Sequence, residues 1–192
     1  MPASYNGVNN KGNAGLVQFL PNGKTDSSFG VNGIAFTDKV AGVAGLALAL
    51  SPGNKIIAVF RYTDKDTTRK ACLARFNANG TPDVAFGIKG IIFNKGLITN
   101  INARMALAIQ PNGKIVEYVS TNYSDNVLLR YNVNSSIDKV FGTNGRVTVP
   151  AAIDGPSLSV APDVKNRRIL VNTPDFAIMG YTNYGKLIHP LV

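Results

Sequence analysis

Short stretches in which large apolar residues alternate with alanine are the most regular feature of the chain. They occupy residues 46–50 and 105–109. Alternation with a period of two is typical of a β-strand, and alanine on the second face predicts close packing there as well. A turn sequence follows, such as Asn112-Gly113, and then a second apolar stretch, such as residues 115–119. Because Asn-Gly supplies the positive-φ residues of a two-residue turn, the pattern predicts β-hairpins.

A second block with fixed spacing recurs three times without gaps. An aromatic residue ends one apolar stretch, an Asp follows, and a Phe-Gly-x-x-Gly sequence begins 10 residues after the aromatic residue in every copy. The Phe residues are 57 and 55 positions apart (29 to 86 and 86 to 141). We predict that the glycines turn the chain between strands and that the Phe fills the space between sheets. The repeated positions are Asp26, Phe29, Gly30, Gly33, Asp83, Phe86, Gly87, Gly90, Asp138, Phe141, Gly142 and Gly145.

The two blocks together predict a repeat of four strands. The strand that ends at the aromatic residue and a short strand after the second glycine precede the two strands of the hairpin. Four antiparallel strands in a repeat of this length are typical of one blade of a β-propeller. We therefore predict an all-β, β-propeller-like array of four-stranded antiparallel blades. The repeats cover about 16–71, 72–127 and 128–177, with a partial fourth at 178–187.

The third repeat departs from the others in its hairpin loop. Pro162 and Arg168 are 6 positions apart, whereas Pro52 and Lys55 are 3 apart at the equivalent place. The third hairpin loop has therefore gained three residues.

The repeat resembles a known bacterial family. Its Leu-x-Arg-Phe/Tyr-Asn, Asp-x-x-Phe-Gly-x-x-Gly and Ala-Leu-Ala-Ile-Gln-Pro-Asn-Gly-Lys-Ile-Val sequences are similar to the delta-60 repeat. The resemblance spans about Leu16 to Leu187. It implies a propeller-like β architecture in a bacterial protein that is secreted or lies in the cell envelope, so an extracytoplasmic location is expected. It implies no reaction, because the family has no catalytic signature to transfer.

The number of repeats leaves the closure of the array open. Propellers typically close with four to eight blades. Three repeats and one further strand leave two strand edges uncovered, which is an aggregation hazard. The N-terminal segment could pair with the strand around 178–181 and close the array within one chain. Alternatively, several copies or a larger partner could share the edges, or the chain could be a piece of a longer ring.

Composition supports strands and turns over helices. The 192 residues include 19 Gly, 10 Pro and 21 Asn, whereas Glu117 is the only glutamate and 45% of the chain is apolar. We predict a single repeat domain over residues 16–192, preceded by a flexible lead-in over residues 1–15. No apolar run approaches the roughly 18 residues of a membrane span. The first residues do not form a signal peptide.

A net charge of +9 favours acidic partners such as nucleic acid, anionic lipid or a polyanionic polysaccharide. No basic run is longer than two residues, as in Arg167-Arg168, so nucleic-acid binding is disfavoured. Basic residues also recur at equivalent positions of the repeats, where they could gather on one rim. We favour the interpretation that they keep exposed strands soluble and protect their edges. These positions are Lys55, Lys114 and Arg168 after the hairpin turns, and Arg75 and Arg130 in strands.

The candidate chemistry is sparse. The repeated Asp residues could line a channel and bind a cation, but Asp at such positions more commonly accepts hydrogen bonds from the backbone of its own turn, and we favour this interpretation. His189 is the only histidine and Cys72 the only cysteine, which we expect to be a buried apolar residue. Zinc sites, Cys-His pairs and Ser-His-Asp triads therefore lack parts. We predict no catalytic residue, no metal and no cofactor.

Three functional hypotheses follow in order of preference. The first is a noncatalytic structural or protein-interaction module, a subunit of a bacterial surface or secretion assembly, which binds a protein partner or a second copy through open blade edges. The second is a propeller that binds a carbohydrate or another polyanion at the loops of its blades. The third is a hydrolase or lyase.

Overall fold

The protein is built from antiparallel β-sheets, which confirms the predicted all-β, β-propeller-like fold class. The computed structural model describes residues 2–4, 14–37, 44–65, 67–99, 103–120, 126–149, 159–165, 167–172 and 178–190. Within these ranges the backbone forms strands and turns without a helix. No helix with the length and apolarity of a membrane span occurs in this part of the chain.

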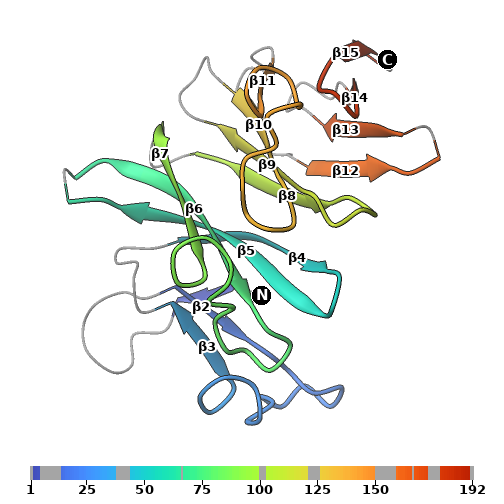
Figure 1. The fold of residues 1–192 in the computed structure, drawn as a ribbon. Coiled ribbons are helices and arrows are strands. Elements are labelled where there is room, and N and C mark those ends of the chain that lie inside the picture. Colours follow the sequence, from blue (N-terminus) through green and yellow to red (C-terminus); the bar gives the residue numbers. More distant parts are fainter. Residues whose placement is uncertain are drawn as a thin grey trace. The chain divides into compact units, whose positions relative to one another are not determined.

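Figure 1 shows four sheets, which we number along the chain. Sheet 1 has three described strands, and sheets 2, 3 and 4 have four each, with strands that follow one another in sequence also adjacent in space. Sheet 1 contains β1 (Pro2–Ser4), β2 (Ala14–Val17) and β3 (Ile34–Thr37). Sheet 2 contains β4 (Ala44–Ser51), β5 (Lys55–Thr63), β6 (Arg69–Phe76) and β7 (Ile91–Thr99). Sheet 3 contains β8 (Met105–Ile109), β9 (Ile115–Ser120), β10 (Asn126–Tyr131) and β11 (Arg146–Val149). Sheet 4 contains β12 (Ser159–Asp163), β13 (Arg168–Asn172), β14 (Ile178–Thr182) and β15 (Leu187–Pro190).

The chain divides into two compact units, Met1–Ile98 and Thr99–Val192. The first contains sheets 1 and 2, and the second contains sheets 3 and 4. Part of the segment predicted as a lead-in forms β1, which pairs with β2 from Pro2↔Leu16 to Ser4↔Ala14. Residues 5–13 lie outside the described ranges.

The sheets are out of phase with the repeats found in the sequence. We expected each repeat to form one sheet, with its hairpin as the last two strands. Instead, the hairpin supplies the first two strands of a sheet, and the next repeat supplies the other two, as in β4–β5 followed by β6–β7. Self-similarity fixes the period of a repeat but not its phase, because a periodic sequence can be divided at any point. The phase is set by strand pairing, such as Ile56↔Phe76 between β5 and β6.

This phase changes the role of the strand at residues 178–182. It is the third strand of sheet 4, where its neighbours are β13 and β15, so both of its edges are paired. Of the alternatives for closing the array, the one in which the N-terminal segment pairs with this strand is therefore wrong.

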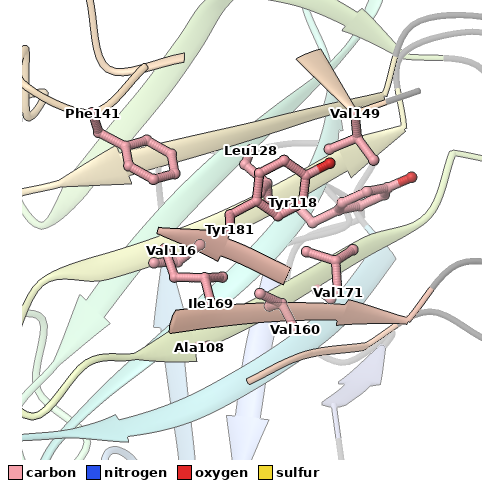
Figure 2. Packing of buried hydrophobic residues seen from close by; sticks show 11 residues of the cluster. Ala108, Val116, Tyr118, Leu128, Phe141, Val149, Val160, Ile169, Val171 and Tyr181 are labelled. Atoms are coloured by element: carbon pink, nitrogen blue, oxygen red, sulfur yellow. The ribbon is translucent and has the colours of Figure 1, made fainter. Parts of the chain in front are cut away.

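A cluster of buried side chains joins the two sheets of the second unit, as Figure 2 shows. Ala106 and Ala108 of β8 belong to this cluster with Val160 of β12, and β8 and β12 are in contact. The alternating alanines thus allow a close approach of sheets 3 and 4. A similar cluster in the first unit contains Leu16 and Phe29 together with side chains of β5 and β6.

Two buried tyrosines lie in the cluster of the second unit. Burial raises the pKa of Tyr181 to about 12. Burial, and secondarily the neighbouring Tyr181, raises the pKa of Tyr118, whereas Arg104 opposes this shift. Both phenols are therefore protonated at neutral pH and act as large apolar groups with a polar end.

Candidate functional site

In the second repeat, Asp83 is the centre of a partly buried ion cluster. Its Oδ2 accepts hydrogen bonds from Lys55 Nζ at 2.7 Å and from Arg75 Nε at 2.8 Å, and 8% of its side chain is exposed. The backbone amide of Asp83 also donates to the carbonyl of Arg75 (2.9 Å), which brings the two side chains together at the end of β6. The other carboxylate oxygen, Oδ1, accepts from the backbone amide of Ala85 at 3.3 Å. One oxygen therefore caps the turn and the other binds two cations.

The third repeat contains the same cluster around Asp138. Its Oδ2 accepts from Lys114 Nζ and from Arg130 Nε, both at 2.7 Å, and its Oδ1 accepts from the amide of Val140 at 3.4 Å. Arg130 is almost fully buried, with 4% of its side chain exposed. A buried charge is costly unless it is paired and hydrogen-bonded. The pairing with Asp138 meets this requirement.

Each cluster is stacked on the Phe of its Phe-Gly turn. The guanidinium carbon of Arg75 lies 4.3 Å from the centroid of the Phe86 ring, and that of Arg130 lies 4.4 Å from the Phe141 ring. Both rings are fully buried. Stacking of a desolvated guanidinium on an aromatic face is favourable and fixes the plane of the guanidinium.

The clusters keep both carboxyl groups ionised. Burial raises the pKa of Asp83, but the hydrogen bond from Lys55 and the charge of Arg75 outweigh this effect and hold it below the ordinary value of 3.8. Burial also raises the pKa of Asp138, but the hydrogen bond from Lys114 and the charge of Arg130 outweigh this effect and hold the pKa below its ordinary value. A carboxylate that is ionised and bound to two cations is suited to structure, and it has no proton to donate at neutral pH. No group of three or more His, Cys, Asp or Glu in the described ranges is placed to hold a metal ion.

The first repeat has the turn without the ion cluster. Asp26 Oδ1 accepts from the amide and hydroxyl of Ser28 at 3.0 and 2.6 Å, so the turn is capped as in the other repeats. Its Oδ2 accepts from Gln18 Nε2 at 3.3 Å. Gln18 occupies the position that Arg75 and Arg130 have in the later repeats, eight residues before the Asp.

The repeated basic residues of the strands and hairpins therefore do not form a free rim. Four of them bind the two central carboxylates described above, and Arg168 binds Asp163 with Nη2 at 2.7 Å from Oδ2. The sequence contained a signal for this arrangement, because Arg and Asp are eight residues apart in both repeats. The expectations from the sequence treated the acidic and the basic positions separately and did not include their pairing.

The glycines of the repeated turn form a joint between neighbouring sheets. The amide of Gly30 donates to the carbonyl of Asn79 in the next sheet at 2.7 Å, and the amide of Gly142 donates to Tyr184 at 2.8 Å. A Cβ on Gly80 would lie 2.7 Å from the nitrogen of Gly30, and a Cβ on Gly185 would lie 2.8 Å from that of Gly142. The two backbone segments at each joint can approach this closely only because both of them have a glycine there.

The remaining candidates lie elsewhere. Cys72 is fully buried in β6 and takes part in no disulfide. His189 is part of β15, where its backbone pairs with Gly180.

A polar cleft of about 250 Å³ lies in the second unit. It is formed by the β8–β9 turn, the long β12–β13 hairpin loop and the turn after β14. Its lining residues are Gln110, Pro111, Asn112, Pro162, Asp163, Val164, Arg167, Arg168 and Asn183. The sequence indicated the longer hairpin loop but not the cleft beside it.

Comparison with known proteins agrees with the β-propeller-like fold. Residues 54–86 and 110–141 match a family described as a domain of unknown function (DUF5122) beta-propeller. These two segments contain Asp83, Asp138 and all four of their cationic partners. The match names no catalytic activity, and the resemblance to the delta-60 repeat stays a prediction.

A solved structure is also similar to the chain. It is described as a crystal structure of an unknown function protein from Dyadobacter fermentans DSM 18053. The identity is 11% and the TM-score 0.43, over 74% of this chain and 39% of that chain. The present chain thus spans well under half the length of that protein. No curated protein matches the sequence significantly.

Proposed function

We propose that the chain is a noncatalytic structural module of delta-60-like repeats that associates with a second copy of itself through exposed aliphatic side chains on its Phe-Gly turns. One observation carries the proposal. The Phe rings of the turns are buried, as are Asp83 and Asp138, whereas the exposed side chains of the turns include Val31, Val84, Ile88 and Val140, which are 67%, 73%, 65% and 63% exposed.

The burial of the charged residues supports a structural role for the repeated motif. Asp83 and Asp138 each bind two cations, and the rings of Phe86 and Phe141 are covered. Groups used in this way hold the turn in place and do not present chemistry to a substrate. The exposed aliphatic side chains of the turn remain available for an apolar contact with a partner.

Aliphatic side chains of this kind gain free energy when they leave water. Single exposed apolar residues are common on protein surfaces and need no explanation. Here exposed aliphatic residues recur in the Phe-Gly turns of three successive repeats. Each chain therefore carries an apolar surface that a second copy can match. A symmetric contact between two copies uses the same patch on both chains.

The net charge of the chain predicts how such association depends on salt. Two chains with a charge of +9 repel each other. Salt screens this repulsion, so association through aliphatic contacts strengthens as the ionic strength rises. Association through ion pairs would weaken instead.

Light scattering across a dilution series tests the proposal. We expect a dimer or larger assembly that dissociates on dilution and is favoured by salt. Ile88→Lys should shift the chain toward the monomer, whereas Val164→Lys, a matched change at a 64% exposed valine outside the Phe-Gly turns, should not. A strictly monomeric wild-type chain at all concentrations and ionic strengths would overturn the proposal.

We further propose an extracytoplasmic role in a bacterial surface or secretion assembly. The support for this setting is the resemblance to the delta-60 repeat. Detection of the native chain only in the cytoplasmic fraction of its host would contradict it.

A further inference from the structure

The polar cleft of the second unit includes positions at which the chain departs from its own repeat. The β12–β13 loop is three residues longer than the equivalent hairpin loop at Pro52 to Lys55. Gln110 stands where the second sheet has Ser51, and the cleft is lined by both the long loop and Gln110. In repeat proteins, insertions into single repeats map to loops on one face, which is often the binding face.

Arg167 lies in the long loop with a backbone conformation that arginine seldom adopts. Its φ is 52°, in the left-handed region. The equivalent residues before Lys55 and Lys114 are Asn54, with φ 57°, and Gly113, with φ 79°. Asn and Gly accept this conformation at low cost, whereas a long side chain is strained there. The loop thus keeps an arginine at the wall of the cleft, at a position where a less strained residue would serve the turn.

Arg130 of the Asp138 ion cluster orients the side-chain amide groups of Gln110 and Asn183. Arg130 can only donate, so its Nη1 fixes the oxygen of Gln110 as the acceptor at 3.5 Å. The Nε2 of Gln110 then donates to Oδ1 of Asn183 at 3.2 Å. Because Oδ1 of Asn183 already accepts this hydrogen bond, its Nδ2 group is the one that can donate to a ligand. Arg130 Nη1 also holds the carbonyl of Asn183 at 2.5 Å.

The side-chain amide of Asn112 is also oriented by a hydrogen bond to its oxygen. Oδ1 of Asn112 accepts from the backbone amide of Lys114 at 3.2 Å, so its Nδ2 group remains to donate. The one acidic residue of the lining, Asp163, is bound by Arg168 through Nε at 3.0 Å and Nη2 at 2.7 Å. The cleft is therefore rich in donors and carries the positive charge of Arg167. Its ligand should supply acceptors and a negative charge.

The size and walls of the cleft limit the ligand further. Its volume of about 250 Å³ is below the roughly 300–1,000 Å³ of pockets for drug-sized molecules, so it suits a single ring. Pro111, Pro162 and Val164 provide apolar wall beside the polar groups. A pyranose ring matches this combination, because it has an apolar C–H surface and hydroxyl groups around its edge.

We propose that the cleft binds a hexuronate residue of an acidic polysaccharide. The carboxylate of the sugar pairs with Arg167, and ring hydroxyls accept hydrogen bonds from the Nδ2 groups of Asn112 and Asn183. None of the residues that line the cleft belongs to a Phe-Gly turn, so the binding does not depend on the proposed self-association.

Titration of the full, ¹⁵N-labelled chain with D-galacturonate, followed by NMR, tests the proposal. We expect saturable shifts of the side-chain amide signals of Asn112 and Asn183 at millimolar ligand. D-galactose and acetate, which lack the carboxylate and the sugar ring respectively, should each bind more weakly. Arg167→Gly should weaken galacturonate binding about tenfold or more.

The glycine variant is chosen because it keeps the left-handed backbone that Gly113 has in the preceding hairpin. It should therefore melt no lower than the wild type, which separates lost binding from lost folding. Asn54→Gly makes the equivalent change in the first unit and should leave binding unchanged. The proposal is overturned if galacturonate causes no shifts at tens of millimolar, if acetate binds equally well, or if Arg167→Gly binds like the wild type.

Discussion

The turn of the first repeat and those of the second and third share their sequence spacing but not their electrostatics. In all three, one oxygen of the Asp caps the backbone of its own turn. Only Asp83 and Asp138 also bind an arginine and a lysine, whereas Asp26 contacts Gln18. The turn thus requires the cap alone. The ion cluster is an addition that holds a buried arginine against the Phe of the turn.

The joint between sheets should give the largest effect. Gly185→Ala places a Cβ 2.8 Å from the nitrogen of Gly142, in addition to the strain of a left-handed alanine. We expect a loss of about 3 to 5 kcal/mol of unfolding free energy. Gly23→Ala is the matched control, because Gly23 has the same φ of 81° and nothing within 4 Å of the added Cβ. It should cost only about 1 to 2 kcal/mol, the strain alone.

Urea unfolding of both glycine variants measures this difference. Equal losses would show that the hydrogen-bonded approach of Gly142 to the next sheet contributes nothing beyond backbone strain.

Removal of the buried guanidinium should give the next largest effect. Arg130→Met leaves the carboxylate of Asp138 with Lys114 as its only cation, and we expect a loss of about 3 kcal/mol. Gln18→Met changes the equivalent position of the first repeat, which is exposed, and should stay within about 0.5 kcal/mol of the wild type. Thermal unfolding by circular dichroism compares the two. Equal melting temperatures for the two variants would contradict a stabilising role for the buried guanidinium.

The ion clusters also predict how stability changes with acid. The pKa values of Asp83 and Asp138 lie below the ordinary 3.8 in the folded state. Their contribution is therefore present above about pH 4 and is lost as the pH falls through the folded pKa. The double variant Asp83→Asn/Asp138→Asn should lose stability less steeply than the wild type in this range. Urea unfolding at a series of acidic pH values would reveal parallel slopes if the prediction is wrong.

Introduction of the missing arginine should give the smallest effect. Gln18→Arg places a guanidinium eight residues before Asp26, as in the other repeats. Because this site is exposed, we expect a gain below about 1 kcal/mol that disappears in high salt. A gain that persists in high salt would contradict the electrostatic explanation.

Much of the fold could be predicted from the sequence, because hairpins leave local signals. Asn112-Gly113 between two apolar stretches predicted the β8–β9 hairpin, and the fixed spacing of Phe-Gly predicted the period. The phase of the sheets could not be predicted, because it depends on pairing between repeats, such as Ile56↔Phe76.

The site was harder to predict than the fold. Each Asp was correctly interpreted as a cap of its turn, but its second oxygen went unassigned. The eight-residue spacing of Arg75 and Asp83, repeated at Arg130 and Asp138, was a signal for their pairing, but the contact itself forms only when the chain folds back at the end of β6. The cleft was missed for a similar reason, since Gln110 and Asn183 are 73 residues apart in the sequence and meet only in the folded unit.

The most direct test of the account is to replace the three repeated Asp residues one at a time with Asn and to measure the free energy of unfolding. Asn keeps a turn-capping oxygen but removes the charge. We predict losses of about 2 to 3 kcal/mol for Asp83→Asn and Asp138→Asn, and less than about 1 kcal/mol for Asp26→Asn. Three equal losses, or no loss at Asp83 and Asp138, would contradict the claim that the ion clusters of the second and third repeats hold their Phe-Gly turns in place.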